Sequence, residues 1–159
     1  MGDIEFISGE AELLDHISAL WESLNELHGT LSPHFHEAFE KRTFHDRKEE
    51  LIAKSQVGRL RIDIACTRGQ RKAIGYCVST VDREGNGEID SIFVEESYRH
   101  RGIARQLMTS ATSWLESLGV NQKRVVVAFG NDEVLSFYTK FGFYPRSFTL
   151  FHKPSDPLG

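Results

Sequence analysis

The apolar positions near the N-terminus form first a short strand-like run and then a helical period. Residues 4–8 predict a first strand. From Glu10 onward apolar side chains recur every three or four residues, which predicts one amphipathic helix. Gly29 and Pro33 end this pattern, and a charged stretch from about His34 to Ser55 predicts a second helical region.

Alternating apolar and polar positions predict strands in the middle of the chain. Residues 60–66 and 74–80 alternate, and Arg68-Gly69-Gln70 between them predicts the turn of an antiparallel hairpin. A third apolar strand ends at Val94. Further on, the chain predicts a β-branched strand, a helix and a closing strand that begins near Pro145; their ranges are 124–129, 132–141 and 143–152. Because no linker or repeat divides the sequence, residues 1–159 are expected to form one α/β domain with a mixed sheet.

The segment from Arg99 to Ala104 joins the strand at 89–94 to a long amphipathic helix. A helix N-terminus offers free N–H groups and the positive end of the helix dipole, and Gly102 leaves space for a ligand near the backbone. Arg101 and Arg105 add further cations. The segment therefore predicts a site for a phosphorylated ligand, although it contains neither a Walker loop nor a Gly-x-Gly-x-x-Gly fingerprint.

Arg99, Gly102 and Ala104 occupy the defined positions of the pattern Gln/Arg-x-x-Gly-x-Gly/Ala. This pattern resembles the coenzyme A signature of the GCN5-related N-acetyltransferase (GNAT) superfamily. Residues 88–98, Glu-Ile-Asp-Ser-Ile-Phe-Val-Glu-Glu-Ser-Tyr, are similar to the family's fourth strand and its approach to the signature, with Glu96 where proline is common. Residues 131–143 resemble the family's spacing from an asparagine to a tyrosine and its Lys-x-Gly-Phe ending.

The resemblance implies a GNAT-like acyl-CoA N-acyltransferase fold, in which helices flank a central, mostly antiparallel sheet with two splayed strands. It implies acetyl-CoA as cosubstrate, with the pantetheine arm bonded to free backbone groups in the opening between those strands. The backbone N–H of Val94 is expected to polarise the thioester carbonyl, and Asn131 either contacts the pantetheine or caps the following helix. The expected coenzyme-binding residues are Phe93, Val94, Arg99, His100, Arg101, Gly102, Ile103, Ala104, Arg105 and Asn131.

Acetyl transfer to an amine needs a base for the ammonium and an acid for the departing thiolate. The resemblance implies that Tyr138 is the general acid, and a phenol has a reference pKa near ~10. The alternative is that Tyr138 is a core aromatic residue of its helix. Glu88 and Asp90 alternate onto one face of their strand, so either one can take the proton, directly or through water. They can equally be solvated charges at a sheet edge, so the identity of the base stays open.

The resemblance implies that the region between the first two helices lines the acceptor pocket. His34, Phe35, His36 and Phe39 are therefore expected to contact the substrate. The histidines of this region lack the convergent Cys, Asp or Glu residues of a metal site, so no metal is expected. The acceptor is expected to be a primary amine on a small molecule or a peptide. The acidic residues near Glu88 favour a cationic one, such as a polyamine, an amino sugar, or a lysine or N-terminal amine.

The chain of 159 residues has a formal net charge of −4, which argues against nucleic acid as a partner. Its N-terminus lacks the apolar core of a signal peptide, and no run approaches the ~20 apolar residues of a membrane span. A cytoplasmic protein with no membrane partner is therefore expected. Cys66 and Cys77 lie in apolar runs and are expected to be buried and reduced. The resemblance also implies a homodimer formed through the last strands.

Together these observations predict an acetyl-CoA-dependent N-acetyltransferase. The amine is expected to attack the bound thioester directly in a ternary complex, without a covalent intermediate. The alternative is a non-catalytic acyl-CoA-binding regulatory domain, which would keep the phosphate-binding turn but transfer nothing.

Overall fold

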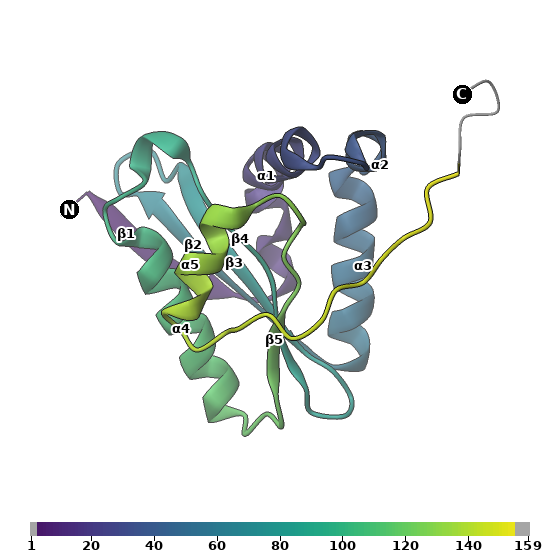
Figure 1. Cartoon of the computed structure of the whole chain (residues 1–159). Coiled ribbons are helices and arrows are strands. Elements are labelled where there is room, and N and C mark those ends of the chain that lie inside the picture. The colour runs from purple at the N-terminus through teal and green to yellow at the C-terminus, as the bar shows by residue number, and fades with distance from the viewer. Residues whose placement is uncertain (1–2, 155–159) are drawn as a thin grey trace.

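A computed structural model of the chain describes residues 3–154 and contains a five-stranded sheet with helices on both faces (Figure 1). The strands lie in chain order across the sheet. The first four pair antiparallel, and the fifth is parallel to the fourth. The predicted mixed, mostly antiparallel sheet is confirmed. The strands are β1 (Ile4–Gly9), β2 (Arg59–Thr67), β3 (Ala73–Val81), β4 (Gly87–Val94) and β5 (Lys123–Val125).

Each face of the sheet is covered by its own group of helices, and each group buries its own hydrophobic core. On one face, Leu14, Trp21 and Leu51 pack against strand residues that include Ile62 and Tyr76. The helices of this face are η1 (Ala11–Ile17), α1 (Ser18–Leu31), α2 (His36–Glu40) and α3 (Phe44–Val57). The opposite core is formed by α4 (Ile103–Ser117) and α5 (Asp132–Thr139), and a short η2 (Glu96–Tyr98) precedes α4. Within residues 3–154, no helix is both long enough and apolar enough to cross a membrane.

The two helical regions of the N-terminal third are more divided than their periodicity predicts. The first begins as a 3₁₀ segment, η1, before it becomes α1. The second is interrupted before α3, where the Thr43 side-chain oxygen accepts a hydrogen bond from the Asp46 N–H at 3.1 Å. A threonine followed three residues later by an acidic residue is a helix N-terminal signal. The expectation of one continuous helical stretch from His34 to Ser55 was therefore wrong.

The C-terminal strands also differ from the prediction. β5 ends at Val125 instead of Phe129, and residues 143–152 form no strand. After Val125 the chain leaves β4 and turns toward the end of α1, where Gly130, with a φ of 103°, lies so close to the Leu31 carbonyl that a Cβ would clash with it. A strand forms only by pairing with a neighbour, and residues 143–152 pair neither with β5, which ends at Val125, nor with the part of β4 beyond that ladder. They run across the molecule as an extended segment (Figure 1).

Candidate active site

β4 and β5 pair over a short length and then diverge. Their register joins Gly87 to Lys123, Glu88 to Arg124 and Ile89 to Val125, and it goes no further. On its other side, β4 shifts register against β3 between Ile89 and Ser91, so Asp90 has no directly opposed residue. Such a β-bulge bends a strand and redirects its side chains. The structure thus has an opening beside residues 90–94 of β4, where backbone groups on the β5 side are left without a strand partner.

A loop with left-handed backbone geometry connects this opening to the N-terminus of α4. His100 has a φ of 64° and Gly102 a φ of 79°. No side chain caps α4, and a Cβ built on Gly102 would meet nothing within 4 Å. The N–H groups of the first turn have no intrahelical acceptor, because the first bond of this helix runs from Gln106 N–H to the Gly102 carbonyl. Free donors, a positive dipole end and open space meet here, as an anion site requires.

The arginines of this loop do not all face the open space. Arg99 donates from Nε to the Val94 carbonyl at 2.9 Å, and its guanidinium lies 5.2 Å from the centroid of the Phe93 ring. Arg101 lies 5.2 Å from the centroid of the Tyr98 ring. Arg99 therefore connects the end of β4 to the loop that leads to α4. Nine of the ten expected coenzyme-binding residues lie along one path, from the end of β4 to the first turn of α4. The tenth, Asn131, lies at the start of α5.

Glu88 and Asp90 form a carboxylate pair bridged by one ammonium group, in which the Asp90 side chain is buried and that of Glu88 is partly buried. The Lys54 Nζ of α3 donates to Glu88 Oε2 at 2.8 Å and also to Asp90 Oδ1. Arg124 Nε donates to Glu88 Oε1, and the Thr80 hydroxyl donates to Asp90 Oδ2, both at 2.7 Å. The Asp90 side chain is 0% exposed and that of Glu88 is 14% exposed. The alternative that these are solvated edge charges is therefore wrong.

The two carboxyl groups differ in proton affinity. Burial, together with the neighbouring Glu88 carboxylate, raises the pKa of Asp90 to about 6 against the opposing attraction of Lys54. Burial acts in the same direction on Glu88, but its bonds to Asp90, Lys54 and Arg124 outweigh it and lower the pKa of Glu88 to about 2. A base works best when its pKa lies near the working pH and its carboxylate is ionised. By this criterion Asp90 is the better proton acceptor of the pair.

Tyr138 and Asn131 lie on α5 and its approach. Tyr138 is 6% exposed, and its ring packs against Phe137 and Phe143 within the α4–α5 core. Burial raises the pKa of the Tyr138 phenol, so it stays protonated at neutral pH. The ring is thus a core element, as the alternative held, while its part in proton transfer stays a prediction. Asn131 occupies the N-cap position of α5 but its side chain makes no capping bond, so the capping alternative is wrong.

A family model described as the acetyltransferase (GNAT) family matches residues 20–143. The chain belongs to this family. The match confirms the resemblance carried by Arg99, Gly102 and Ala104, and with it the prediction of an acetyltransferase enzyme. No curated protein sequence matches the chain.

Solved structures, acetyltransferases among them, share the fold. An aminoglycoside N-acetyltransferase, AAC(6')-Iy, in complex with CoA is 19% identical with a TM-score of 0.64, and the match covers 95% of this chain and 94% of that one. A putative acetyl transferase from Pyrococcus furiosus is 21% identical with a TM-score of 0.65, covering 95% and 100%. A variant of the BH1408 protein from Bacillus halodurans is 16% identical with a TM-score of 0.74, covering 95% and 99%. The predicted GNAT fold is confirmed.

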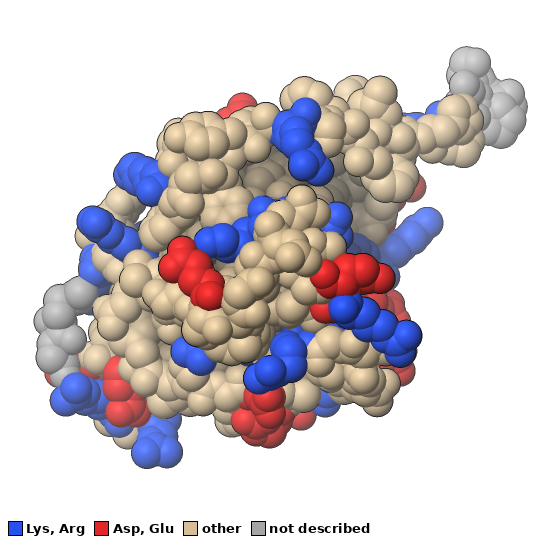
Figure 2. All heavy atoms as spheres, turned by 90° about the horizontal axis from the view of Figure 1, so that it is seen from below, with Lys and Arg blue, Asp and Glu red and all other residues tan. Residues whose placement is uncertain are grey.

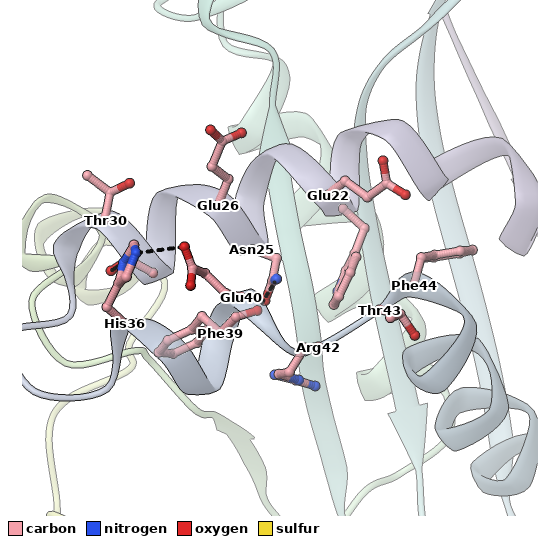
Figure 3. A pocket seen from close by; sticks show the side chains of 12 residues that line it. Glu22, Asn25, Glu26, Thr30, His36, Phe39, Glu40, Arg42, Thr43 and Phe44 are labelled. Atoms are coloured by element: carbon pink, nitrogen blue, oxygen red, sulfur yellow. Dashed lines mark hydrogen bonds and ion pairs between the residues drawn. The ribbon is translucent and has the colours of Figure 1, made fainter.

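In this GNAT acetyltransferase a cleft of about 460 Å³ lies between α1 and α2 (Figure 3). Of the four expected acceptor-contacting residues, His36 and Phe39 line this cleft, and His34 and Phe35 do not. His36 bonds to the Gly29 carbonyl and to Glu40, each at 2.9 Å. Three carboxylates, Glu22, Glu26 and Glu40, and one guanidinium, Arg42, line the cleft, and no residue of β4 does. Among residues 3–154, no three His, Cys, Asp or Glu side chains converge as metal ligands would.

Four residues that contact the carboxylate pair were missed by the sequence analysis: Arg47, Lys54, Thr80 and Arg124. Arg47 donates from its guanidinium to the Asp90 carbonyl at 3.2 Å, so it satisfies a backbone group at the bulge. Arg47 and Lys54 lie four residues before and three residues after Leu51, which is buried, so all three share one stripe of α3. Cations on the buried stripe of a helix were the signal that could have found them, because such charges need partners.

Charged side chains of both signs are mixed on the face of the molecule that is seen from below. Seen from below, Lys and Arg side chains lie beside Asp and Glu side chains and do not form one basic face (Figure 2).

Both cysteines, Cys66 and Cys77, are buried and free, as expected.

Proposed function

We propose that the protein transfers the acetyl group of acetyl-CoA to a primary amine by direct attack in a ternary complex. The observation that carries this proposal is the joint placement of an anion cradle at Gly102 and a buried carboxylate pair at the divergence of β4 and β5. The pyrophosphate binds the free N–H groups of α4, and the pantetheine arm lies along residues 90–94 of β4. The thioester then reaches the carboxylate pair.

Proton transfer follows from the same arrangement. The Glu88–Asp90 pair takes a proton from the incoming ammonium, and the neutral amine attacks the carbonyl carbon of the thioester. The backbone N–H of Val94 is proposed to polarise the carbonyl oxygen, and Asn131 to contact the pantetheine. The carbon–sulfur bond then breaks, and the Tyr138 phenol supplies a proton to the departing thiolate. No covalent enzyme intermediate is required.

We infer a cationic acceptor from the charge around the cleft between α1 and α2. Glu22, Glu26 and Glu40 line it, together with the aromatic ring of Phe39. Carboxylates and aromatic faces both attract ammonium groups. His36 and Phe39 are the proposed contacts of a part of the acceptor distant from the reacting amine, because no residue of β4 lines this cleft. One protein of similar fold, AAC(6')-Iy, is an aminoglycoside N-acetyltransferase. A cytoplasmic location remains a prediction.

The direct test of this function is calorimetric titration with acetyl-CoA, with NADH as a control for other phosphorylated ligands, followed by thiol release across a panel of amines. Micromolar binding of acetyl-CoA alone and thiol release with cationic amines are expected. Binding without release for any amine would favour the non-catalytic regulatory domain. Absence of binding would overturn the coenzyme site.

Replacing Tyr138 with phenylalanine is expected to lower kcat about tenfold while leaving the Kd for acetyl-CoA unchanged. The effect is at the small end for general acids, because a thiolate is already a good leaving group with a reference pKa near ~8.5. Steady-state kinetics and calorimetry on the same preparation separate the two quantities. An unchanged kcat would mean that solvent or another group protonates the thiolate.

We propose that a second copy of the chain covers the exposed C-terminal segment, residues 144–151. Tyr144, Phe148, Leu150 and Phe151 are 73%, 80%, 90% and 75% exposed. Val126 and Phe129, which follow β5, are also exposed. Exposed apolar side chains that follow one another along a segment favour an interaction surface, and an extended segment with no strand partner suits pairing with the same segment of a second copy.

Sedimentation analysis is expected to give a dimer that the double substitution Phe148→Glu and Leu150→Glu converts to a monomer. The desolvation of two buried carboxylates would make the interface unfavourable. Leu118→Glu, which places the same charge on an exposed apolar position at the end of α4, is expected to leave the dimer intact. A monomeric wild-type protein would overturn this assembly.

A further inference from the structure

Lys54 is the residue that joins the two candidate bases to each other. It lies on the last turns of α3, 34 residues before Glu88 and 36 before Asp90, and its ammonium bonds to one oxygen of each. The remaining oxygens are held from other elements: Arg124 of β5 holds Glu88, and Thr80 of β3 holds Asp90. The side chains of Lys54 and Arg124 are 39% and 68% exposed, so the two cations of the cluster reach the surface while the Asp90 side chain does not.

The contacts of the two carboxylates are unequal in charge. Glu88 faces two cations, Lys54 and Arg124, whereas Asp90 shares Lys54 with Glu88 and otherwise meets only a neutral hydroxyl at its side chain. Arg47, the other cation of α3 near this cluster, bonds to the Asp90 backbone carbonyl and to Glu50. Two buried carboxylates close together cannot both be ionised at low cost unless cations offset them. Lys54 supplies the one positive charge that both groups share.

We propose that Lys54 is a positioning residue that holds Glu88 ionised and leaves Asp90 as the group that receives, through water, the proton of the acceptor ammonium. This inference rests on the proposed function and deepens it. Without the Lys54 bridge the pair retains one side-chain cation, Arg124, on Glu88 alone, and Asp90 loses its only charged side-chain partner. The pair then binds its proton more tightly, because a nearby opposite charge favours the ionised form.

The expected consequence is a displaced pH profile. Removing an opposite charge at hydrogen-bonding distance raises a carboxyl pKa by roughly 1 unit or more. In Lys54→Met the acidic limb of kcat/KM therefore moves upward by about that amount, so the rate falls about tenfold at the pH where the wild-type limb begins and recovers at alkaline pH. Lys54→Arg keeps the charge and is expected to restore the limb toward its wild-type position. Lys54→Gln keeps hydrogen-bonding capacity without charge and is expected to behave like Lys54→Met.

The matched control is Lys48→Met. Lys48 is on the same helix and forms an ion pair with Asp15 at 2.6 Å, away from β4. It is expected to leave the pH profile unchanged. Calorimetric Kd values for acetyl-CoA and melting temperatures are measured for every variant with one fixed acceptor. A purely structural role for Lys54 would lower the rate by the same factor at every pH, with Lys54→Arg no better than Lys54→Gln, and that result overturns the inference. Failure of the wild-type protein to transfer acetyl groups would instead overturn the proposed function.

Discussion

Replacing Gly102 with aspartate is expected to weaken acetyl-CoA binding at least about 100-fold, or ~2.8 kcal/mol. The side chain would occupy the open space in front of the first turn of α4, where nothing lies within 4 Å of a Cβ. It would also place a negative charge where the pyrophosphate meets the free N–H groups. Aspartate tolerates both a left-handed φ and a helix N-cap position better than most residues, so the fold is expected to survive. Calorimetric titration with acetyl-CoA measures the effect.

Gly119→Asp is the matched control for this substitution. Gly119 follows the other end of α4, has a φ of 65°, and likewise has nothing within 4 Å of a Cβ. The two variants therefore impose the same backbone demand and the same charge change at opposite ends of one helix. Gly119→Asp is expected to bind acetyl-CoA with wild-type affinity. Equal affinity of Gly102→Asp and the wild type, with both proteins folded by circular dichroism, would place the phosphates elsewhere.

The coenzyme loop and the sheet were predictable because their signals are local. Alternation over residues 60–66 and 74–80 depends on near neighbours, and the observed β2 and β3 contain both ranges. The apolar stripe of α4 likewise fixes the helix that begins at Ile103, and the preceding Gly102 marks the open N-terminus. These features need no knowledge of distant parts of the chain.

The C-terminal strand and the Lys54 bridge were not predictable for the opposite reason. Residues 143–152 are rich in aromatic and other apolar side chains, but a strand also needs a partner strand, and the position of that partner depends on where the chain goes after Val125. Lys54 reaches Glu88 across 34 residues of sequence. A helical lysine looks like a solvated charge until the packing of α3 against the sheet is known.

The sequence predicted that Glu88 and Asp90 form a pair, but the difference between their proton affinities follows from the structure. Sequence alternation places Glu88 and Asp90 on one face and treats them alike. The bulge at Asp90 and the cations gathered on Glu88 separate them. The contacts of the pair depend on the same packing, since Arg47 and Lys54 reach it from α3. The choice of base therefore depends on tertiary contacts that no short motif contains.

Asp90→Asn is expected to lower kcat at least about 100-fold near pH 8, and Glu88→Gln about tenfold or less. The pKa of Asp90 is raised to about 6, so its carboxylate is ionised and ready to accept a proton above that pH. As the pH falls through about 6, Asp90 becomes protonated and the wild-type rate declines. Asparagine cannot take the proton, so the acidic limb near pH 6 is expected to vanish with the rate. Glu88 keeps its bonds to the cations Lys54 and Arg124, which favour its ionised form, so it is not expected to replace Asp90 as the base.

The control for loss of a buried carboxylate is Asp63→Asn. The Asp63 side chain is 3% exposed and bonds to Arg61, Ser8 and Ser110, so it belongs to a separate cluster that contacts β1 and α4. Its substitution is expected to lower the melting temperature and to leave the acidic limb in place, whereas Asp90→Asn removes that limb with the Kd for acetyl-CoA unchanged. If Glu88→Gln abolishes the acidic limb and Asp90→Asn retains it, Glu88 is the base. The two cations on Glu88 would then keep the more exposed carboxylate ionised because that carboxylate itself meets the acceptor.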